Sequence, residues 1–230
     1  MSKTLGIKQL PSTLGSACLA TLSGVIAPIL FLIILTIVET LQPGYNRIQQ
    51  TISRLVLGPY GFLQTVAFFA FGLLLIVFAM RLGFAIVSTR RSAKIGAFFF
   101  NLIGLGFILV GIFPTENPGV ALTFNAVIHQ GTSVAIAVLF PLACLAIAPA
   151  LKGDTRWKGA FAYTIATGIV ALVLIILGVA MRANKLWSGL YERVLLLNGL
   201  VWIELVSYRL LRQCRYERRE ARKNELISIQ

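Results

Sequence analysis

The sequence predicts an all-α fold, an integral membrane bundle of six transmembrane helices with a short interfacial helix between spans one and two. The first observation behind this prediction is composition, because the 230-residue chain is 57% hydrophobic, 13% charged and has a mean hydropathy of +0.85. Soluble globular chains are nearer to about 45–50% apolar and about 25% charged. The second observation is a set of six apolar runs, each near the ~20 residues that a helix needs to cross a ~30 Å hydrocarbon layer.

The first apolar run extends from about Leu14 to Leu41. It is too long for the apolar region of a cleaved signal peptide, so we expect a retained span. Pro28 lies inside this run and should kink the helix, because proline lacks the backbone N–H donor. The other five runs cover residues 61–80, 96–113, 127–150, 159–181 and 190–211.

The rest of the chain offers no second domain, internal repeat or low-complexity linker. We therefore expect an N-terminal segment 1–13, one six-helix transmembrane domain 14–211 and a basic tail 212–230. The arginines of the tail begin at Arg209, within the sixth run, so the sixth helix should continue out of the membrane.

The longest polar interruption in the first part of the chain is the stretch 43–61, which has turn sequences at both ends. Within it, apolar residues recur at the spacing of one helical face, at Ile48, Ile52, Leu55 and Val56. This pattern predicts a short amphipathic helix that lies in the membrane interface. Its opposite face carries Arg47, Gln50 and Arg54.

Lysine and arginine are unevenly divided between the two sides of the predicted bundle. Most of the 21 fall on the side that holds both termini and the second-to-third and fourth-to-fifth loops. The cytoplasmic side of membrane proteins carries such an excess, so we expect a multi-pass protein with cytoplasmic N- and C-termini. The other side carries only Arg47, Arg54, Arg182, Lys185 and Arg193.

Several classes of site are not expected. The net charge of +13 follows from the topology, and no groove-reading motif accompanies it, so we expect no nucleic-acid partner. The single histidine and the scattered carboxylates lack the short spacing of a zinc site. No phosphate-binding glycine loop or nucleophile elbow is present in the sequence. We therefore expect no metal and no cofactor.

The three cysteines, Cys18, Cys144 and Cys214, are widely separated and lack metal-ligand spacing. All three fall toward the cytoplasmic side of the predicted topology, where thiols stay reduced. We therefore expect small apolar core residues or an incidental tail residue.

Polar side chains are sparse on the non-cytoplasmic side, and four segments carry them at the same membrane level. Polar groups at membrane depth are costly and tend to mark function. We therefore expect a shared pocket there. The candidate binding residues are Thr51, Arg54, Thr115, Glu116, Thr132, Glu192 and Arg193.

Ser53 and His129 are the candidate catalytic pair, because a hydroxyl nucleophile needs an adjacent base and His129 is the single histidine. The alternative for His129 is a buried or interfacial imidazole bonded to a carboxylate or a carbonyl. Glu204, inside the sixth run, is a candidate binding or proton-handling group. Its alternative is pairing with another residue or with interfacial water.

Several of these segments together resemble the signature of a known family. They are Pro43-Gly44-Tyr45, Ile52-Ser53-x-Leu55, Gly58-Pro59-Tyr60-Gly61, Gly111 to Glu116, His129 and Gly189 to Arg193. The prokaryotic six-span family that they resemble is domain of unknown function 998 (DUF998), in which an aspartate is common where this chain has Glu116. The resemblance covers most of residues 14–211 and implies a location in the plasma (inner) membrane of a prokaryote. It implies no activity.

The first functional hypothesis is an amphiphile-binding or membrane-maintenance protein whose outer pocket recognises a lipid or isoprenoid headgroup. Its partners would be membrane lipids or an amphiphilic small molecule. The second hypothesis is an intramembrane hydrolase of lipid esters, in which Ser53 or Thr51 attacks and His129 carries the proton. This layout is similar to that of the androgen-induced six-span fatty-ester hydrolases, which pair a threonine with a histidine.

The third hypothesis is a small proton-coupled transporter, for which Asn198 and Glu204 within the sixth run are the motivation. The small bundle and the lack of a sequence repeat count against it. Whether the protein is an enzyme and which oligomer it forms stay open at the level of sequence.

Overall fold

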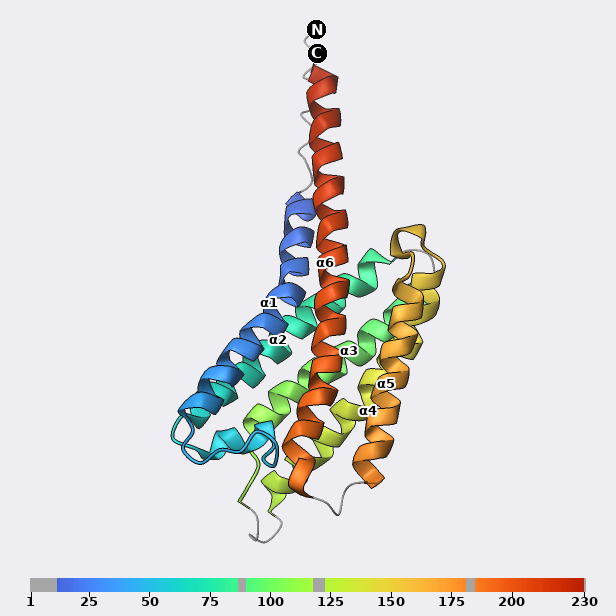
Figure 1. Ribbon diagram of the computed structural model, residues 1–230. Coiled ribbons are helices and arrows are strands. Elements are labelled where there is room, and N and C mark those ends of the chain that lie inside the picture. The colour runs from blue at the N-terminus through green and yellow to red at the C-terminus, as the bar shows by residue number, and fades with distance from the viewer. Residues whose placement is uncertain (1–11, 87–89, 118–122, 181–184, 230) are drawn as a thin grey trace.

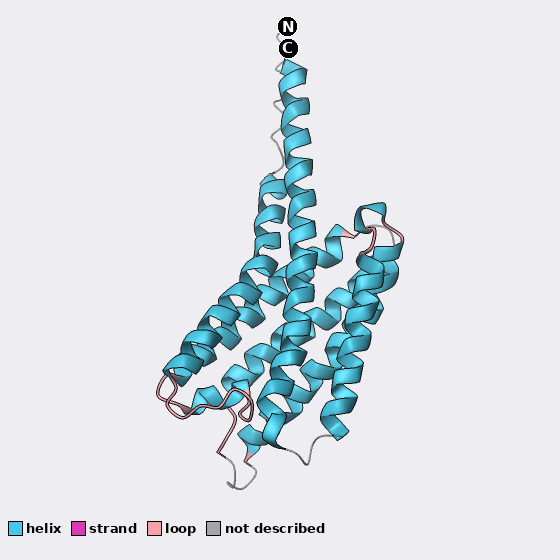
Figure 2. Ribbon diagram, in the orientation of Figure 1, coloured by secondary structure: helices cyan, strands magenta, loops and turns pink. Residues whose placement is uncertain are grey.

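The computed structural model describes residues 12–86, 90–117, 123–180 and 185–229, and these residues form a helical bundle (Figure 2). By length and composition, each of the six α-helices could cross a membrane, which confirms the predicted six-span fold. The positions of Lys3, Lys8 and Arg182 used in the charge count lie outside the described residues. The helices are α1 (Ser12–Leu41), α2 (Gly61–Ala85), α3 (Arg90–Ile112), α4 (Phe124–Lys152), α5 (Ala160–Ala180) and α6 (Ser188–Ile229).

The six helices form a closed ring, in which each helix contacts the next along the chain and α6 returns to contact α1 (Figure 1). We name the two ends of this ring by their connections. The η1 end, at the bottom of Figure 1, carries the α1–α2, α3–α4 and α5–α6 connections. The terminal end, at the top, holds the first residues of α1 and the outer part of α6. α5 is the most sparsely packed member, and its contact with α6 is the thinnest in the ring.

The short helix between α1 and α2 is a 3-10 helix, η1 (Ile52–Leu57). It is shorter than the predicted amphipathic helix, since Ile48 lies outside it and is exposed. Ile52 and Leu55 are buried in the core of the bundle. The structure therefore confirms a short helix between the first two spans, and its apolar side chains Ile52 and Leu55 pack inside the ring, where their burial stabilises the fold.

α1 and α6 pack against each other in an antiparallel register. Near the terminal end, Cys18 meets Cys214. At the η1 end, Glu39 forms an ion pair with Arg193. Between these contacts, Gly24 leaves room for Ser207, and a Cβ atom at this position would collide with the serine side chain. The first and last spans are thus joined at both ends of their contact.

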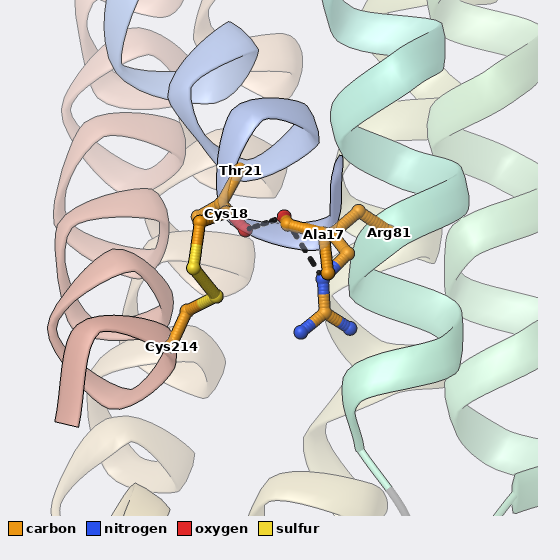
Figure 3. The surroundings of a disulfide bond; sticks show 5 residues. All are labelled: Ala17, Cys18, Thr21, Arg81 and Cys214. Carbon is orange, nitrogen blue, oxygen red and sulfur yellow. Dashed lines mark hydrogen bonds between the residues drawn. A yellow bond between two sulfur atoms is a disulfide. The ribbon is translucent and has the colours of Figure 1, made fainter. Parts of the chain in front are cut away.

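Cys18 and Cys214 form a disulfide, so the expectation of reduced and incidental thiols is wrong for this pair (Figure 3). The two residues are 196 positions apart in sequence. Nothing in that spacing indicates the bond, which depends on the return of α6 to α1. Beside it, Nε of Arg81 donates a 3.3 Å hydrogen bond to the Ala17 carbonyl. Cys144 is free and buried.

α6 continues beyond the bundle at the terminal end, as the sequence predicts (Figure 1). Its 42 residues span about 63 Å at ~1.5 Å per residue, which is twice the ~30 Å of a hydrocarbon layer. The base of this extension contacts the α4–α5 connection. Arg209 donates a 3.0 Å hydrogen bond to the Lys158 carbonyl, and Gln213 donates one of 3.3 Å to the Arg156 carbonyl.

Candidate functional site

A cavity of about 140 Å³ lies inside the ring, between η1 and the helices α1, α2, α3, α4 and α6. Its walls are largely apolar and include six phenylalanines, whose rings contact one another in tilted or edge-to-face pairs, as Phe71 and Phe107 do at 4.6 Å between centroids. Such pairs add rigidity and stability beyond the area they bury. The six phenylalanines in the walls are Phe31, Phe68, Phe71, Phe100, Phe107 and Phe140.

Polar side chains line the same cavity near the η1 end. Ser53 comes from η1, His129 and Ser133 come from the first three turns of α4, and Glu192 comes from the second turn of α6. Residues further along these helices, such as Ile203, continue the lining with apolar side chains. The cavity is therefore polar toward the η1 end and apolar toward the middle of the bundle.

Glu192 links α6 to η1. Its Oε2 accepts a 2.6 Å hydrogen bond from the backbone N–H of Ile52, the first residue of η1. The first N–H groups of a helix have no partner within that helix, so the carboxylate satisfies one of them from a distant segment. A backbone bond of 3.0 Å from Leu190 to the Ile48 carbonyl supports the same junction. Within the described residues, Oε1 of Glu192 has no hydrogen-bond partner.

His129 lies against the last turn of α3. Its Nδ1 is 2.8 Å from the carbonyl oxygen of Phe113, and the Val110 carbonyl also interacts with the ring. Pro114 has no N–H group, so the Val110 carbonyl lacks its usual partner in the helix. Because a carbonyl oxygen only accepts, Nδ1 donates its proton. The imidazole therefore caps the end of α3 at the edge of the cavity.

The candidate catalytic residues line one cavity without forming a nucleophile–base pair. The structure gives no hydrogen bond between Ser53 and His129 among the residues it describes. Oγ of Ser53 lies 3.3 Å from Oγ1 of Thr51. Oγ of Ser133 donates a 2.8 Å hydrogen bond to the backbone carbonyl of His129. Both serine hydroxyls thus have partners other than the imidazole.

Arg193 lies at the η1 end, where it forms a hydrogen-bond network outside the cavity lining. Its guanidinium donates to Glu39 through Nε at 3.0 Å and again through Nη2. It also donates to the Tyr45 hydroxyl at 2.7 Å, the Gln50 carbonyl at 3.1 Å and the Gly189 carbonyl at 2.9 Å. Together these bonds join α1, the α1–α2 connection and α6.

Tyr45 is the second centre of this network. Its hydroxyl donates toward the backbone carbonyls of Gln50 and Thr51, at 3.0 and 2.8 Å. Burial raises the pKa of this phenol, while the hydrogen bond from Arg193 opposes that rise. Tyr45 belongs to the segments that resemble the family, but its role could not be predicted, because a tyrosine in a polar connection carries no signal of a hydrogen-bond partner far along the chain.

Two candidate residues from helices lie beside the cavity and do not line it. Arg54 is half-buried on η1. Thr132 on α4 faces α3, where its methyl group would be 3.5 Å from a Cβ atom at Gly106. Neither side chain lines the space that Ser53 and His129 share.

Three further candidates lie away from the cavity. Thr115 and Glu116 are in the α3–α4 connection, where Glu116 accepts a hydrogen bond from the Thr123 hydroxyl. Glu204 lies further along α6, and its Oε2 is buried without a hydrogen-bond partner in the described part of the chain. The predicted shared pocket therefore contains Ser53, His129 and Glu192 of the proposed set, and Thr51 contacts it through Ser53.

The aromatic walls were also missed in the sequence, although a signal for them exists. Phe100, Ile103, Phe107 and Val110 recur at one face of α3, and Phe68, Phe71 and Leu75 do so on α2. Periodicity alone does not distinguish an aromatic core from the wall of a cavity. That difference depends on whether the facing helices fill the space.

The fold and the cavity define the class: an all-helical, multi-pass membrane protein with an internal cavity near one end of its bundle. The chain belongs to the family described as "Protein of unknown function (DUF998)", whose model matches residues 25–209. This match confirms the resemblance found in the sequence. Neither a curated protein nor a solved structure matches the chain.

Proposed function

We propose that this protein binds a membrane amphiphile in the cavity at its η1 end. The observation that carries the proposal is the polarity of one continuous cavity, with Ser53, His129 and Glu192 toward one end and phenylalanine rings beyond them. An amphiphile has the same distribution, a polar head joined to an apolar chain. Ligand sites are typically apolar concavities with a few well-placed polar groups.

The size of the cavity supports an occupant that enters it only in part. An apolar protein cavity of about 150 Å³ accommodates one benzene molecule. The cavity here has a similar volume of about 140 Å³. It therefore accommodates a headgroup-proximal segment of a chain, while the remainder of a long chain stays among the membrane lipids.

We also propose that the η1 end faces away from the cytoplasm of a prokaryotic cell. The excess of lysine and arginine at the terminal end supports this orientation. The disulfide lies toward that same end, and disulfides are rare in reducing compartments. Cys18 and Cys214 are, however, only 8% and 1% exposed, so soluble reductants have little access to the sulfur atoms. Fusions of green fluorescent protein and of alkaline phosphatase to the C-terminus test this orientation. Fluorescence without phosphatase activity is the expected result.

The binding proposal is tested by filling the cavity. Ala137 lines it, and Ala135 lies on the same helix with an exposed side chain. Lipids that co-purify with the wild type, Ala137→Trp and the matched control Ala135→Trp are extracted and quantified by mass spectrometry. We expect one amphiphile near equimolar amounts in the wild type and the control, and at least five-fold less in Ala137→Trp. Equal amounts in all three proteins would contradict the proposal.

A second candidate function is hydrolysis of a lipid ester in the same cavity, favoured by the presence of Ser53 and His129 in one lining. In that reaction the Ser53 oxygen would bond to the ester carbonyl carbon, its proton would pass to the imidazole, and the alcohol would leave with that proton. Water would then release the acid. Fluorophosphonate labelling of the wild type but not of Ser53→Ala or His129→Ala supports this function, and no labelling of any of the three argues against it.

A further inference from the structure

The charges around the cavity distinguish between classes of headgroup. Among the described residues that line it, Glu192 is the single carboxylate, and no lysine or arginine is present. Tight binding of phosphate or carboxylate groups in proteins generally uses arginine or lysine, because charge-assisted hydrogen bonds are about twice as strong as neutral ones. The lining therefore lacks the residues that would offset the charge of an anionic headgroup.

Arg193 is the nearest cation in sequence to Glu192, and it has no donor left for a ligand. A guanidinium group has five N–H donors. Nε donates to Glu39, the two Nη1 donors bind the Gln50 and Gly189 carbonyls, and the two Nη2 donors bind Glu39 and Tyr45. Recruiting this arginine to a phosphate would break a bond of the network that joins α1 to α6.

The polar groups that remain at the cavity are rich in acceptors. Oε1 of Glu192 has no partner among the described residues, and its Oε2 already accepts from Ile52. The hydroxyl proton of Ser133 is directed to the His129 carbonyl, which leaves the lone pairs of that oxygen. A carboxylate oxygen and hydroxyl lone pairs best match a group that donates hydrogen bonds.

We infer that the occupant is an amphiphile with a hydrogen-bond-donating head, a hydroxyl or an ammonium group, and without phosphate or carboxylate. This inference rests on the proposed function and narrows its ligand class. The head donates to Glu192 and to the serine oxygens, and the first part of the chain contacts the phenylalanine walls.

The arrangement of α4 and α5 gives the rest of the chain a path into the bilayer. The two helices are close at the terminal end and diverge toward the η1 end (Figure 1). No residue of α5 lines the cavity in the described structure, whereas Ser133 of α4 both lines the cavity and is exposed. The exposure of Ser133 shows that the cavity reaches the surface of the bundle beside α4. A long chain therefore leaves the cavity between α4 and α5.

The test uses four amphiphiles with one chain length: 1-dodecanol, dodecylamine, dodecanoic acid and dodecyl phosphate. Each is titrated into the purified protein in detergent at pH 7, and the shift in melting temperature gives an apparent Kd, since a ligand that binds the folded state raises this temperature. Ala137→Trp, with the cavity filled, corrects for effects on the detergent micelle. We expect the alcohol and the amine to bind at least ten-fold more tightly than the two anionic amphiphiles.

The variant Glu192→Gln tests whether the head of the bound amphiphile lies at Glu192. The amide oxygen of glutamine still accepts from the Ile52 N–H, so the junction with η1 is retained. We expect this variant to bind dodecylamine at least ten-fold more weakly and dodecanol within about three-fold of the wild type, because the amine loses an ion pair and the alcohol retains an acceptor. Glu116→Gln, which changes a carboxylate outside the cavity, is the matched control. Ser53→Ala is a second variant, which removes a polar group of the cavity lining and leaves Glu192 intact.

The outcomes separate the two proposals. If dodecyl phosphate or dodecanoic acid binds as tightly as dodecanol, the inference about the head is wrong and amphiphile binding stands. If none of the four shifts the melting temperature relative to Ala137→Trp, the proposed function fails and the inference fails with it. If the amine and alcohol bind but Glu192→Gln and Ser53→Ala leave both affinities unchanged, the head does not lie at this end of the cavity, and the inference is overturned.

Discussion

Glu39 of α1 and Arg193 of α6 form a buried ion pair at the η1 end, although 154 residues separate them in sequence. Their side chains are only 7% and 13% exposed. Arg47 approaches the other oxygen of Glu39 at 2.9 Å, but its side chain is 54% exposed. Arg193 is therefore the partner that neutralises Glu39 within the protein, and the pair joins the first and last spans.

Replacing Arg193 with leucine should destabilise the protein. Removing one member of a buried ion pair costs about 3–5 kcal/mol, because the other charge is left without compensation. We expect the free energy of unfolding to fall by an amount near the lower end of this range, since Arg47 still contacts Glu39. Thermal unfolding in detergent measures the change, with Arg54→Leu as the matched control on η1. Equal melting temperatures for the two variants would show that the pair does not stabilise the fold.

The disulfide should be detectable by counting thiols. The chain has three cysteines, so alkylation of the denatured protein should add one group without reductant, at Cys144, and three after reduction. The double variant Cys18→Ser/Cys214→Ser should lose about 2–4 kcal/mol of stability, as is typical when a cross-link of this kind is removed. Cys144→Ala is the control for alkylation. Three additions without reductant would mean that the two thiols stay reduced.

Gln64 offers a test in which a polar residue opposes stability. It is fully buried in the first turn of α2, and both polar atoms of its side chain lack hydrogen-bond partners among the described residues. An unsatisfied buried polar group costs about 1–3 kcal/mol. Gln64→Leu should therefore increase the free energy of unfolding by about 1 kcal/mol and raise the melting temperature. Gln130→Leu, at an exposed position on α4, is the control. A loss of stability in Gln64→Leu would indicate that this amide has a partner.

The α4–α5 connection should make stability depend on pH. Asp154 forms a 2.6 Å salt bridge with Arg156, and the hydrogen bond from that side chain lowers the pKa of the carboxyl group. Because the pKa of Asp154 is lower in the folded state, the salt bridge contributes fully to stability at pH values above the unfolded-state pKa of about 3.9. It is lost as the pH falls through the folded-state value.

Asp154→Asn keeps the cap on η2 (Thr155–Trp157) and removes the charge. Because the Arg156 side chain is 41% exposed, solvent screening limits the expected loss to about 0.5 kcal/mol. The difference in melting temperature between wild type and variant should be present at pH 6 and shrink as the pH falls below about 3.9. Glu220→Gln on the tail is the control. A difference that grows as the pH falls would contradict this assignment.

How far the candidate site could be predicted depends on how local its signals are. His129, Glu192 and Ser53 stand out in sequence because they are rare polar residues at a common membrane level. The different roles of these three residues cannot be seen in the sequence. The cap that His129 forms on α3 depends on the packing of α4 against Phe113 and Val110. The bond between Glu192 and Ile52 joins residues 140 positions apart.

The sequence by itself determined the class, the number of spans and the family. These properties follow from local quantities, namely the length of each apolar run, the hydrocarbon thickness and short motifs. Only the tertiary structure decided that Cys18 meets Cys214, that Arg193 is fully occupied by Glu39 and its neighbours, and that six phenylalanines surround a space instead of filling it. The physical reason is the closed ring. A membrane makes every apolar run a helix, but only the packing of these helices determines which faces meet and where a cavity remains.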